Sequence, residues 1–333
     1  MSPPAPRRRR YGVLALVGLV PLVALASVAL GANALGPGEL AHALFSPDGA
    51  EGDIVVRNLR VPRTLLGLLV GAALGAAGVV MQGHTRNALA EPGLLGVSAG
   101  AAFAVVLSLR LELVGSMLGM VGAAAVGATL AALAVYALAR SSVRSGGPAL
   151  VVAGAALTAF LAALTSAIAL LDAKTLDAYR FWAVGSLAER GADTPGVIAP
   201  FVVAGLVLAA LNARSLDLLS LGEDVAASMG VRVTRARLVG LAAITLLTAA
   251  SVAACGPIAF IGLLAGTIAR ALVGASWTRA TLVGAVAGVV LLLASDVAGR
   301  LVAGPGELQV GVVSGVIGAP LLIWVIRRRD LLL

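Results

Sequence analysis

The sequence predicts an all-α polytopic membrane protein with ten transmembrane helices, and three observations lead to this fold class. The chain has 333 residues, 60% of them hydrophobic and only 12% charged, and its mean hydropathy is +1.03. A soluble domain carries about 25% charged residues, roughly twice this fraction. The apolar residues come in runs of about 20, the length of a helix that crosses a bilayer. These runs also lack the alternation of an outer-membrane barrel strand.

Ten apolar windows mark the expected spans of a single transmembrane domain over residues 1–333, and they lie at 11–33, 64–83, 93–109, 113–139, 148–171, 195–211, 238–255, 257–273, 280–299 and 309–326. The basic tail at 1–10 and the sequence Ala32-Asn33-Ala34 resemble a signal peptide with its cleavage site. The first apolar stretch is about 20 residues long, however, and a secretory signal has about 7–15. We therefore interpret it as a retained span.

Basic residues set the expected orientation. With the N-terminus in the cytoplasm, 16 of the 24 basic residues fall in inside segments, whereas most acidic residues fall outside. Cytoplasmic loops of membrane proteins retain Lys and Arg, so both termini are expected on the inner side of a cell membrane. These arginines also account for the net charge of +8, and no loop combines basic and aromatic residues as a nucleic-acid surface would.

Two similar short segments of the sequence suggest an inverted repeat. Arg60-Val61-Pro62-Arg63 precedes the second span and Arg232-Val233-Thr234-Arg235 precedes the seventh. Under the orientation above, the two segments lie on opposite sides of the membrane, as an inverted repeat of spans 2–5 and 7–10 requires. Two matches of four residues leave chance as the alternative.

Several function classes lose support. The chain has no Walker-type phosphate loop, so neither ATP hydrolysis nor a bound cofactor is expected of it. Cys255 is the only cysteine, and His42 and His84 stand alone, so no metal site is expected. The middles of the spans hold almost no ionisable groups, which disfavours an ion-coupled secondary transporter. A membrane-embedded enzyme is also disfavoured, because the chain has no paired carboxylates at one predicted depth.

The long polar interval at 212–237 is expected to be a cytoplasmic coupling loop that contains a short helix. Gly222 can cap this helix, Glu223 and Asp224 complement its dipole, and Gly230 can end it in a left-handed conformation. Its small residues would present a flat docking surface, although an amphipathic linker is the plain alternative. The residues expected to couple to a motor protein are Gly222, Glu223, Asp224, Ala226, Ala227 and Gly230.

Two further sets of residues stand out. Glycines that recur every four residues allow close helix packing, or helix shifts during gating, and they are Gly67, Gly71, Gly75, Gly311 and Gly315. Charged residues also gather on the expected outer side, where they can contact lipid headgroups or the carboxylates of a soluble partner. They are Arg57, Arg60, Arg63, Asp296 and Arg300.

Motifs in this order resemble the permeases of bacterial ABC importers for iron–siderophore, haem and cobalamin, the FecCD family. The resemblance runs from about Arg57 and rests on RVPRTLLGLLVGAALGAAGVVMQGHTRNALAEPGLLGVSAGAA at 60–102, FWAVGSL at 181–187, LGEDVAASMGV at 221–231, GPIAFIGLL at 256–264, SDVAGR at 295–300 and GELQVGVVSGVIGAP at 306–320. It implies a type II permease whose substrate is a ferric siderophore or related metal chelate, with cobalamin or haem as alternatives.

The resemblance also implies partners. Two permease subunits, identical or paralogous, would form the pathway, and two cytoplasmic ATPase subunits would use ATP and Mg²⁺ and dock on 223–230. A substrate-binding protein outside the cell would dock on Arg60, Arg63 and Arg300. The chain departs from the family pattern at Ala88 and Gln309, which replace prolines, and at Ala265-Gly266, which replace Pro-His.

Overall fold

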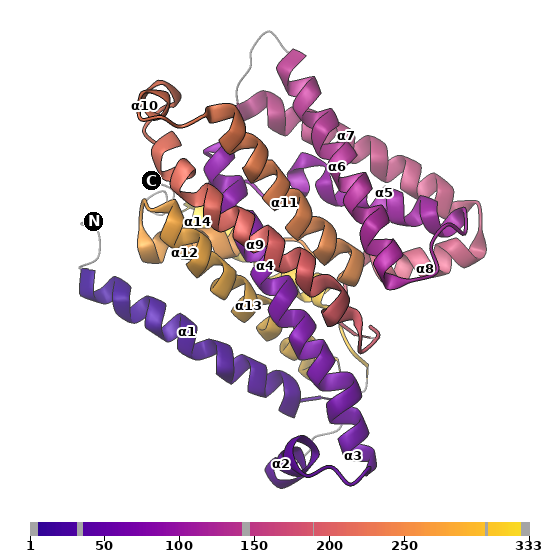
Figure 1. Ribbon diagram of the computed structural model, residues 1–333. Coiled ribbons are helices and arrows are strands. Elements are labelled where there is room, and N and C mark those ends of the chain that lie inside the picture. The colour runs from indigo at the N-terminus through magenta and orange to yellow at the C-terminus, as the bar shows by residue number, and fades with distance from the viewer. Residues whose placement is uncertain (1–5, 32–35, 142–146, 189, 304–305, 328–333) are drawn as a thin grey trace.

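The protein is an all-helical bundle, seen in a computed structural model that describes residues 6–31, 36–141, 147–188, 190–303 and 306–327. No strand occurs among these residues. The predicted cleavage sequence at 32–34 and part of the basic tail lie outside them. Figure 1 shows long helices packed side by side, with α10 at one end of the bundle and α2 and α3 at the other.

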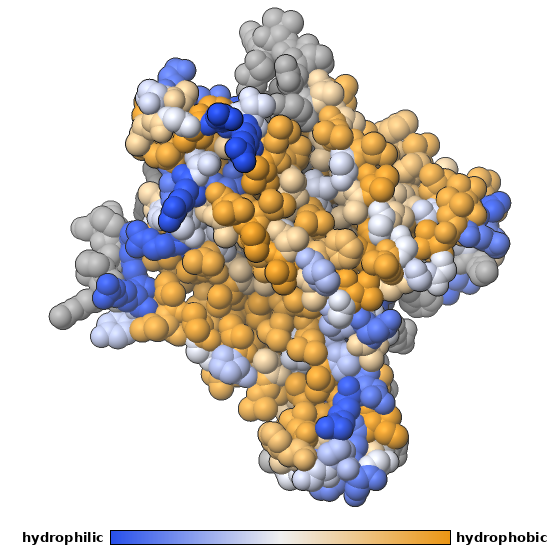
Figure 2. Space-filling model, in the orientation of Figure 1, coloured by the Kyte–Doolittle hydropathy of each residue, from blue (hydrophilic) through white to orange (hydrophobic). Residues whose placement is uncertain are grey.

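Ten helices correspond to the ten predicted spans. They are α1 (Pro6–Ala29), α4 (Val61–Thr85), α5 (Val97–Arg110), α6 (Met117–Ser141), α7 (Gly147–Leu170), α9 (Thr194–Leu219), α11 (Val233–Cys255), α12 (Ile261–Val273), α13 (Trp277–Val302) and α14 (Val310–Arg327). Within the described part of the chain, seven apolar helices are long enough to cross a membrane, and α5, α12 and α14 supply three shorter apolar helices. In Figure 2 an apolar band separates the hydrophilic patches at the two ends of the bundle.

Six shorter elements connect them, and they are α2 (Pro37–Phe45), α3 (Glu51–Ile54), the π-helix η1 (Val55–Arg60), the 3-10 helix η2 (Pro92–Leu95), α8 (Ala173–Ala183) and α10 (Glu223–Ser228). Of these six elements, only α10 was predicted from the sequence. Helix boundaries also differ from the predicted ones. Residues 6–10 of the expected tail belong to α1, and α9 continues to Leu219, so the connection around α10 is shorter than the predicted loop at 212–237.

The two helices α5 and α12, of 14 and 13 residues, follow irregular segments at 86–96 and 256–260. Each is the second span of one half of the proposed inverted repeat, so the pattern of a long helix followed by a short one recurs in both halves. This shared helix pattern supports the proposed inverted repeat in addition to the similar four-residue segments.

The centre of the bundle is the crossing of α4 and α13, and glycines make it close. A Cβ atom on Gly71 would lie 2.8 Å from the carbonyl oxygen of Gly288, and one on Gly75 would collide with the carbonyl oxygen of Gly284. Gly67 packs against the side chain of Leu293. Glycine thus lets the α4 and α13 backbones meet at Gly71 and Gly75 and makes room for the Leu293 side chain at Gly67, while a role in gating stays a prediction.

The remaining two predicted glycines differ from each other. A Cβ on Gly311 would collide with the carbonyl oxygen of Val184, and the Gly311 N–H donates to the Gly185 carbonyl at 3.0 Å. Gly315 has open space around its ideal Cβ position. Spacing alone could not separate these cases, because the neighbour of Gly311 is a connecting segment that lies far away in sequence.

Candidate coupling and docking sites

Helix α10 forms a compact projection at one end of the bundle, which we call the coupling end (Figure 1). Gly222 stands at its N-cap with φ of +117°, and Gly230 follows it with φ of +86°, as the sequence predicted. Ala226 is completely buried, in a small cluster with Leu219 and Ala236. One side of the helix is thus held by its own bundle.

The other side of α10 is free of such packing. Glu223, Asp224 and Ala227 are exposed, and Glu223 forms an ion pair with Arg237 of α11. The pair links the first turn of α10 to the first turns of a long helix. Burial of Ala226 and exposure of Ala227 leave a short polar helix whose orientation is fixed and whose outer face is available to a partner.

Two further contacts tie the coupling end to the rest of the bundle, and neither was found from the sequence. Arg86, which ends α4 in a left-handed conformation with φ of +51°, donates to the Leu219 carbonyl at 2.8 Å. The Asp217 carboxylate accepts from the backbone N–H of Trp277 at 2.5 Å and from the Thr278 hydroxyl at 2.7 Å. Asp217 therefore caps α13 from α9.

His84, for which the sequence predicted no role, packs between helices near the coupling end. Its Nε2 lies 2.7 Å from the Asn212 amide nitrogen, and a Cβ on Gly240 would collide with the imidazole. Helices α4, α9 and α11 therefore meet at one hydrogen bond that only a glycine at 240 can accommodate.

The opposite end of the bundle, which we call the arginine end, brings together the three arginines expected to dock a binding protein. Arg63 pairs with Asp296 at 2.8 Å and with Glu307 at 2.7 Å. Arg300 pairs with the same Asp296 at 2.8 Å, and the side chains of Arg300 and Asp296 are 2% and 1% exposed. The guanidinium groups are thus engaged within the chain.

Two of these arginines also hold the end of α1. Arg300 donates to the carbonyls of Ser27 and Leu30 at 2.8 and 2.7 Å, and Arg60 donates to the carbonyls of Val28 and Ala29 at 3.1 and 2.8 Å. The last carbonyls of a helix have no intrahelical partner and carry partial negative charge, which the guanidinium groups satisfy. Docking stays a prediction for these residues, and anchoring of α1 is the role that the geometry gives them.

A cavity of about 690 Å³ opens at the arginine end. Its charged and aromatic lining residues are Arg60, Arg63, Trp182, Arg190, Arg300 and Glu307. The Nε atom of Arg300 and the indole nitrogen of Trp182 are buried and have no hydrogen-bond partner among the described residues. A pocket lined by four guanidinium groups and one carboxylate suits an anionic group.

Between the two ends, the irregular segments before α5 and α12 meet. The Glu91 carboxylate accepts from the backbone N–H of Phe260 at 2.5 Å. Burial raises the pKa of the Glu91 carboxyl, and the Phe260 N–H acts in the opposite direction. The two residues are 169 positions apart in the sequence, so no local pattern predicts this contact.

Two of the three departures from the family pattern, at Ala88 and at Ala265-Gly266, lie in this region. The Gln82 amide, on a side chain that is 1% exposed, donates to the carbonyls of Ala88 and Leu263 at 2.8 and 3.1 Å. A Cβ on Gly266 would collide with that amide, so glycine at 266 permits the close approach of Gln82. The third departure, Gln309, lines the cavity at the arginine end and accepts the backbone N–H of Val312 through its carbonyl.

Comparison with known proteins decides the family. The model of the FecCD transport family matches residues 19–328 of this chain. The chain belongs to the FecCD transport family. It is 45% identical over 325 residues to the ferric enterobactin transport system permease protein FepD of Escherichia coli K12, covering 95% of this chain and 96% of that protein.

Another relative and a solved structure support the same family assignment. The iron(3+)-hydroxamate import system permease protein FhuB of Bacillus subtilis 168 is 37% identical, with 96% of this chain and 85% of that protein covered. A solved metal-chelate type ABC transporter in an inward-facing conformation superimposes with a TM-score of 0.82, at 25% identity, over 95% of this chain and 98% of the other. The FecCD chain described here is an integral membrane permease subunit of an ABC importer.

Proposed function

We propose that this permease carries a ferric siderophore, a ferric chelate of net negative charge, through the membrane. Support comes from the relative named for ferric enterobactin and from the cavity at the arginine end. Oxygen-rich chelators that saturate Fe³⁺ with catecholate or carboxylate groups are anions, and a cavity lined by four guanidinium groups favours anions over neutral or cationic solutes.

The energy comes from ATP hydrolysed by two cytoplasmic ATPase subunits, which dock on α10 of each of two permease subunits. The single observation that carries this proposal is the geometry of α10, where Ala226 is buried and Ala227 is exposed. A helix held on one side transmits displacement to α9 and α11 instead of deforming. The coupling end then faces the cytoplasm, and both termini lie on that side.

A delivery protein docks at the arginine end, where its carboxylates enter the cavity around Arg63. Two opposite charge changes test this step. Arg63→Glu is expected to weaken the stimulation of ATP hydrolysis by the delivery protein, whereas Glu307→Gln, at a partly exposed carboxylate, is expected to strengthen it. If both variants leave stimulation at low salt unchanged, docking uses another surface.

The substrate is tested by uptake into liposomes that contain this permease, its ATPase and its delivery protein. Radiolabelled ferric tris-catecholate, ferric hydroxamate, haem and cobalamin are compared. We expect ATP-dependent uptake of a ferric siderophore. Uptake of haem or cobalamin alone would assign one of the alternative substrates, and uptake driven by an ion gradient without the ATPase would replace the proposal by a secondary transporter.

A further inference from the structure

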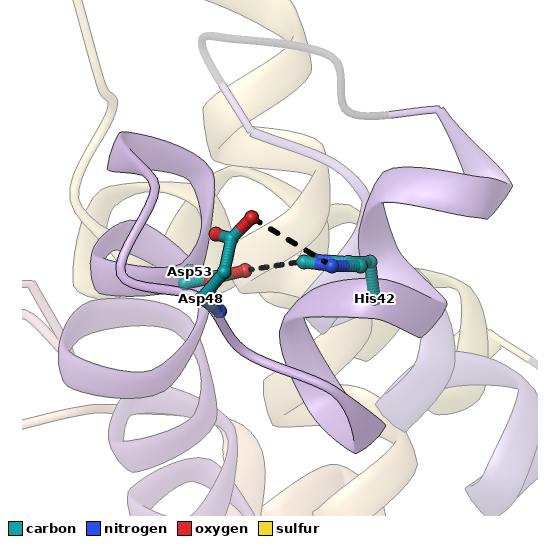
Figure 3. A group of neighbouring side chains, drawn as sticks. All are labelled: His42, Asp48 and Asp53. Atoms are coloured by element: carbon teal, nitrogen blue, oxygen red, sulfur yellow. Dashed lines mark hydrogen bonds and ion pairs between the residues drawn. The ribbon is translucent and has the colours of Figure 1, made fainter.

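His42, Asp48 and Asp53 lie together at the arginine end, in the connection between α1 and α4 (Figure 3). His42 is in the last turn of α2, Asp48 is in the loop after it and Asp53 is in α3. One potential metal-ligand atom from each residue lies within 4.8 Å of the other two. This group was not predicted from the sequence, in which His42 stands alone and no metal site is expected.

The two carboxylates are held by backbone N–H groups on one oxygen each. Asp53 Oδ2 accepts from the N–H groups of Asp48 and Gly49 at 2.8 and 3.1 Å, and Asp48 Oδ1 accepts from the N–H of Ala50 at 3.0 Å. The loop closes in this way because Gly49 has φ of +90°, which few residues other than glycine adopt. Outer hydrogen bonds of this kind orient the ligands of metal sites.

The other oxygen of each carboxylate faces His42. Asp53 Oδ1 lies 3.6 Å from Nδ1 and Asp48 Oδ2 lies 3.9 Å from Nε2. Both distances exceed a hydrogen bond. The Asp53 side chain is only 7% exposed, so its second oxygen is a nearly buried acceptor directed at the imidazole without bonding to it.

We propose that His42, Asp48 and Asp53 form a binding site for a divalent transition-metal cation, with one imidazole nitrogen and two monodentate carboxylates as ligands. Zn²⁺ binds these donors at about 2.0–2.2 Å, which places tetrahedral ligands roughly 3.4 Å apart. The ligand atoms, which lie within 4.8 Å of one another, must therefore approach by up to about 1.4 Å. Asp48 and His42 can do so, because their side chains are 66% and 47% exposed. A fourth position remains for water.

A bound cation would tie α2 to α3 and η1. These elements share a small hydrophobic cluster of Leu40, Ala43 and Val56, which packs on Val28 at the end of α1. Because η1 also carries Arg60, the site would stiffen the segment that holds α1. The inference does not depend on which chelate is transported.

The test is Zn²⁺ binding to the full chain, purified in detergent and stripped of metal, in the presence of excess Mg²⁺. We expect one Zn²⁺ per chain, with affinity reduced at least about tenfold in His42→Ala and Asp53→Asn. Asp48→Asn provides the same test at an exposed side chain, so it does not depend on folding of the variant. Glu39→Gln removes another carboxylate from α2 and is expected to change affinity less than about twofold.

The chain contains only two histidines, which gives a residue-specific readout. Carbethoxylation measured by mass spectrometry should modify the half-exposed His42, and Zn²⁺ should protect it. Amide exchange across residues 37–60 should also slow with Zn²⁺. Wild-type Zn²⁺ affinity in His42→Ala and Asp48→Asn, or loss of all binding in excess Mg²⁺, would overturn the proposal and leave nonspecific carboxylate binding or a simple His–Asp ion pair.

Discussion

Arg63 of α4 and Asp296 of α13 form a bidentate pair, with hydrogen bonds of 2.8–3.2 Å, although 233 residues separate them. The pair fixes the two central helices to each other at the arginine end. Asp217 fixes the other end of α13 to α9, close to α10. Helix α13 therefore runs between the proposed delivery and motor surfaces, with a direct contact at each end.

Replacement of Arg300 by Ala should destabilise the arginine end. It leaves the Asp296 carboxylate with one fewer partner and frees two carbonyls at the end of α1. Breaking a buried ion pair costs about 3–5 kcal/mol. Thermal unfolding and amide exchange across α1 measure the effect. Arg57→Ala, which removes one exposed hydrogen bond of 3.4 Å, is the matched control and should change stability by less than about 0.5 kcal/mol.

Loss of the Asp217 cap should weaken the contact between α9 and α13. Asp217→Ala removes the acceptor for the Trp277 N–H, and loss of a side-chain acceptor at the start of a helix costs about 0.5–2 kcal/mol. Because the variant leaves α10 intact, ATP hydrolysis should persist while transport per ATP falls. Asp177→Ala, at an exposed i,i+3 pair, serves as control. An unchanged ratio of transport to hydrolysis in Asp217→Ala would exclude this contact from the coupling route.

The two adjacent alanines of α10 should respond differently to leucine. Ala226→Leu overpacks a buried position and should lower stability by about 1–3 kcal/mol, together with transport. Ala227→Leu alters only the exposed face, so stability should be retained while transport and the stimulation of hydrolysis are lost. Unfolding is followed in detergent and uptake in liposomes. Equal effects of both substitutions on stability would contradict the orientation of α10.

The glycine crossing makes a prediction with an internal control. Gly75→Ala places a methyl group against the Gly284 carbonyl, so α4 and α13 must separate, and we expect a loss of about 1–3 kcal/mol together with reduced transport. Gly315→Ala adds the same group in open space and should change stability by less than about 0.5 kcal/mol. Similar unfolding temperatures for the two variants would show that the crossing tolerates side chains.

Local patterns predicted the spans and the limits of α10 because those depend on nearby residues. Apolar runs set the ten helices, and glycines at 222 and 230 delimit α10 through positive φ angles that glycine adopts without strain. The short helices α2 and α8 were missed, since neither has an apolar run long enough to stand out.

The sites were predicted less completely because their contacts are long-range. The sequence grouped Arg60, Arg63, Asp296 and Arg300 on one side of the membrane. It could not predict that Arg63 pairs with Asp296, 233 residues away, or that Arg60 and Arg300 bind the end of α1. Conversely, Asp48 and Asp53 are close to His42 in sequence, yet their approach depends on the turn at Gly49. Only the three-dimensional structure brings either set together.

The most direct test of the motor-driven account is thiol labelling of Ala227→Cys. The only native cysteine, Cys255, is buried, so a membrane-impermeant reagent reports on position 227 alone. We predict labelling from the cytoplasmic side only, protection when the ATPase is bound, and arrested transport after labelling. Labelling from the outer side, or full transport by the labelled protein, would contradict the account.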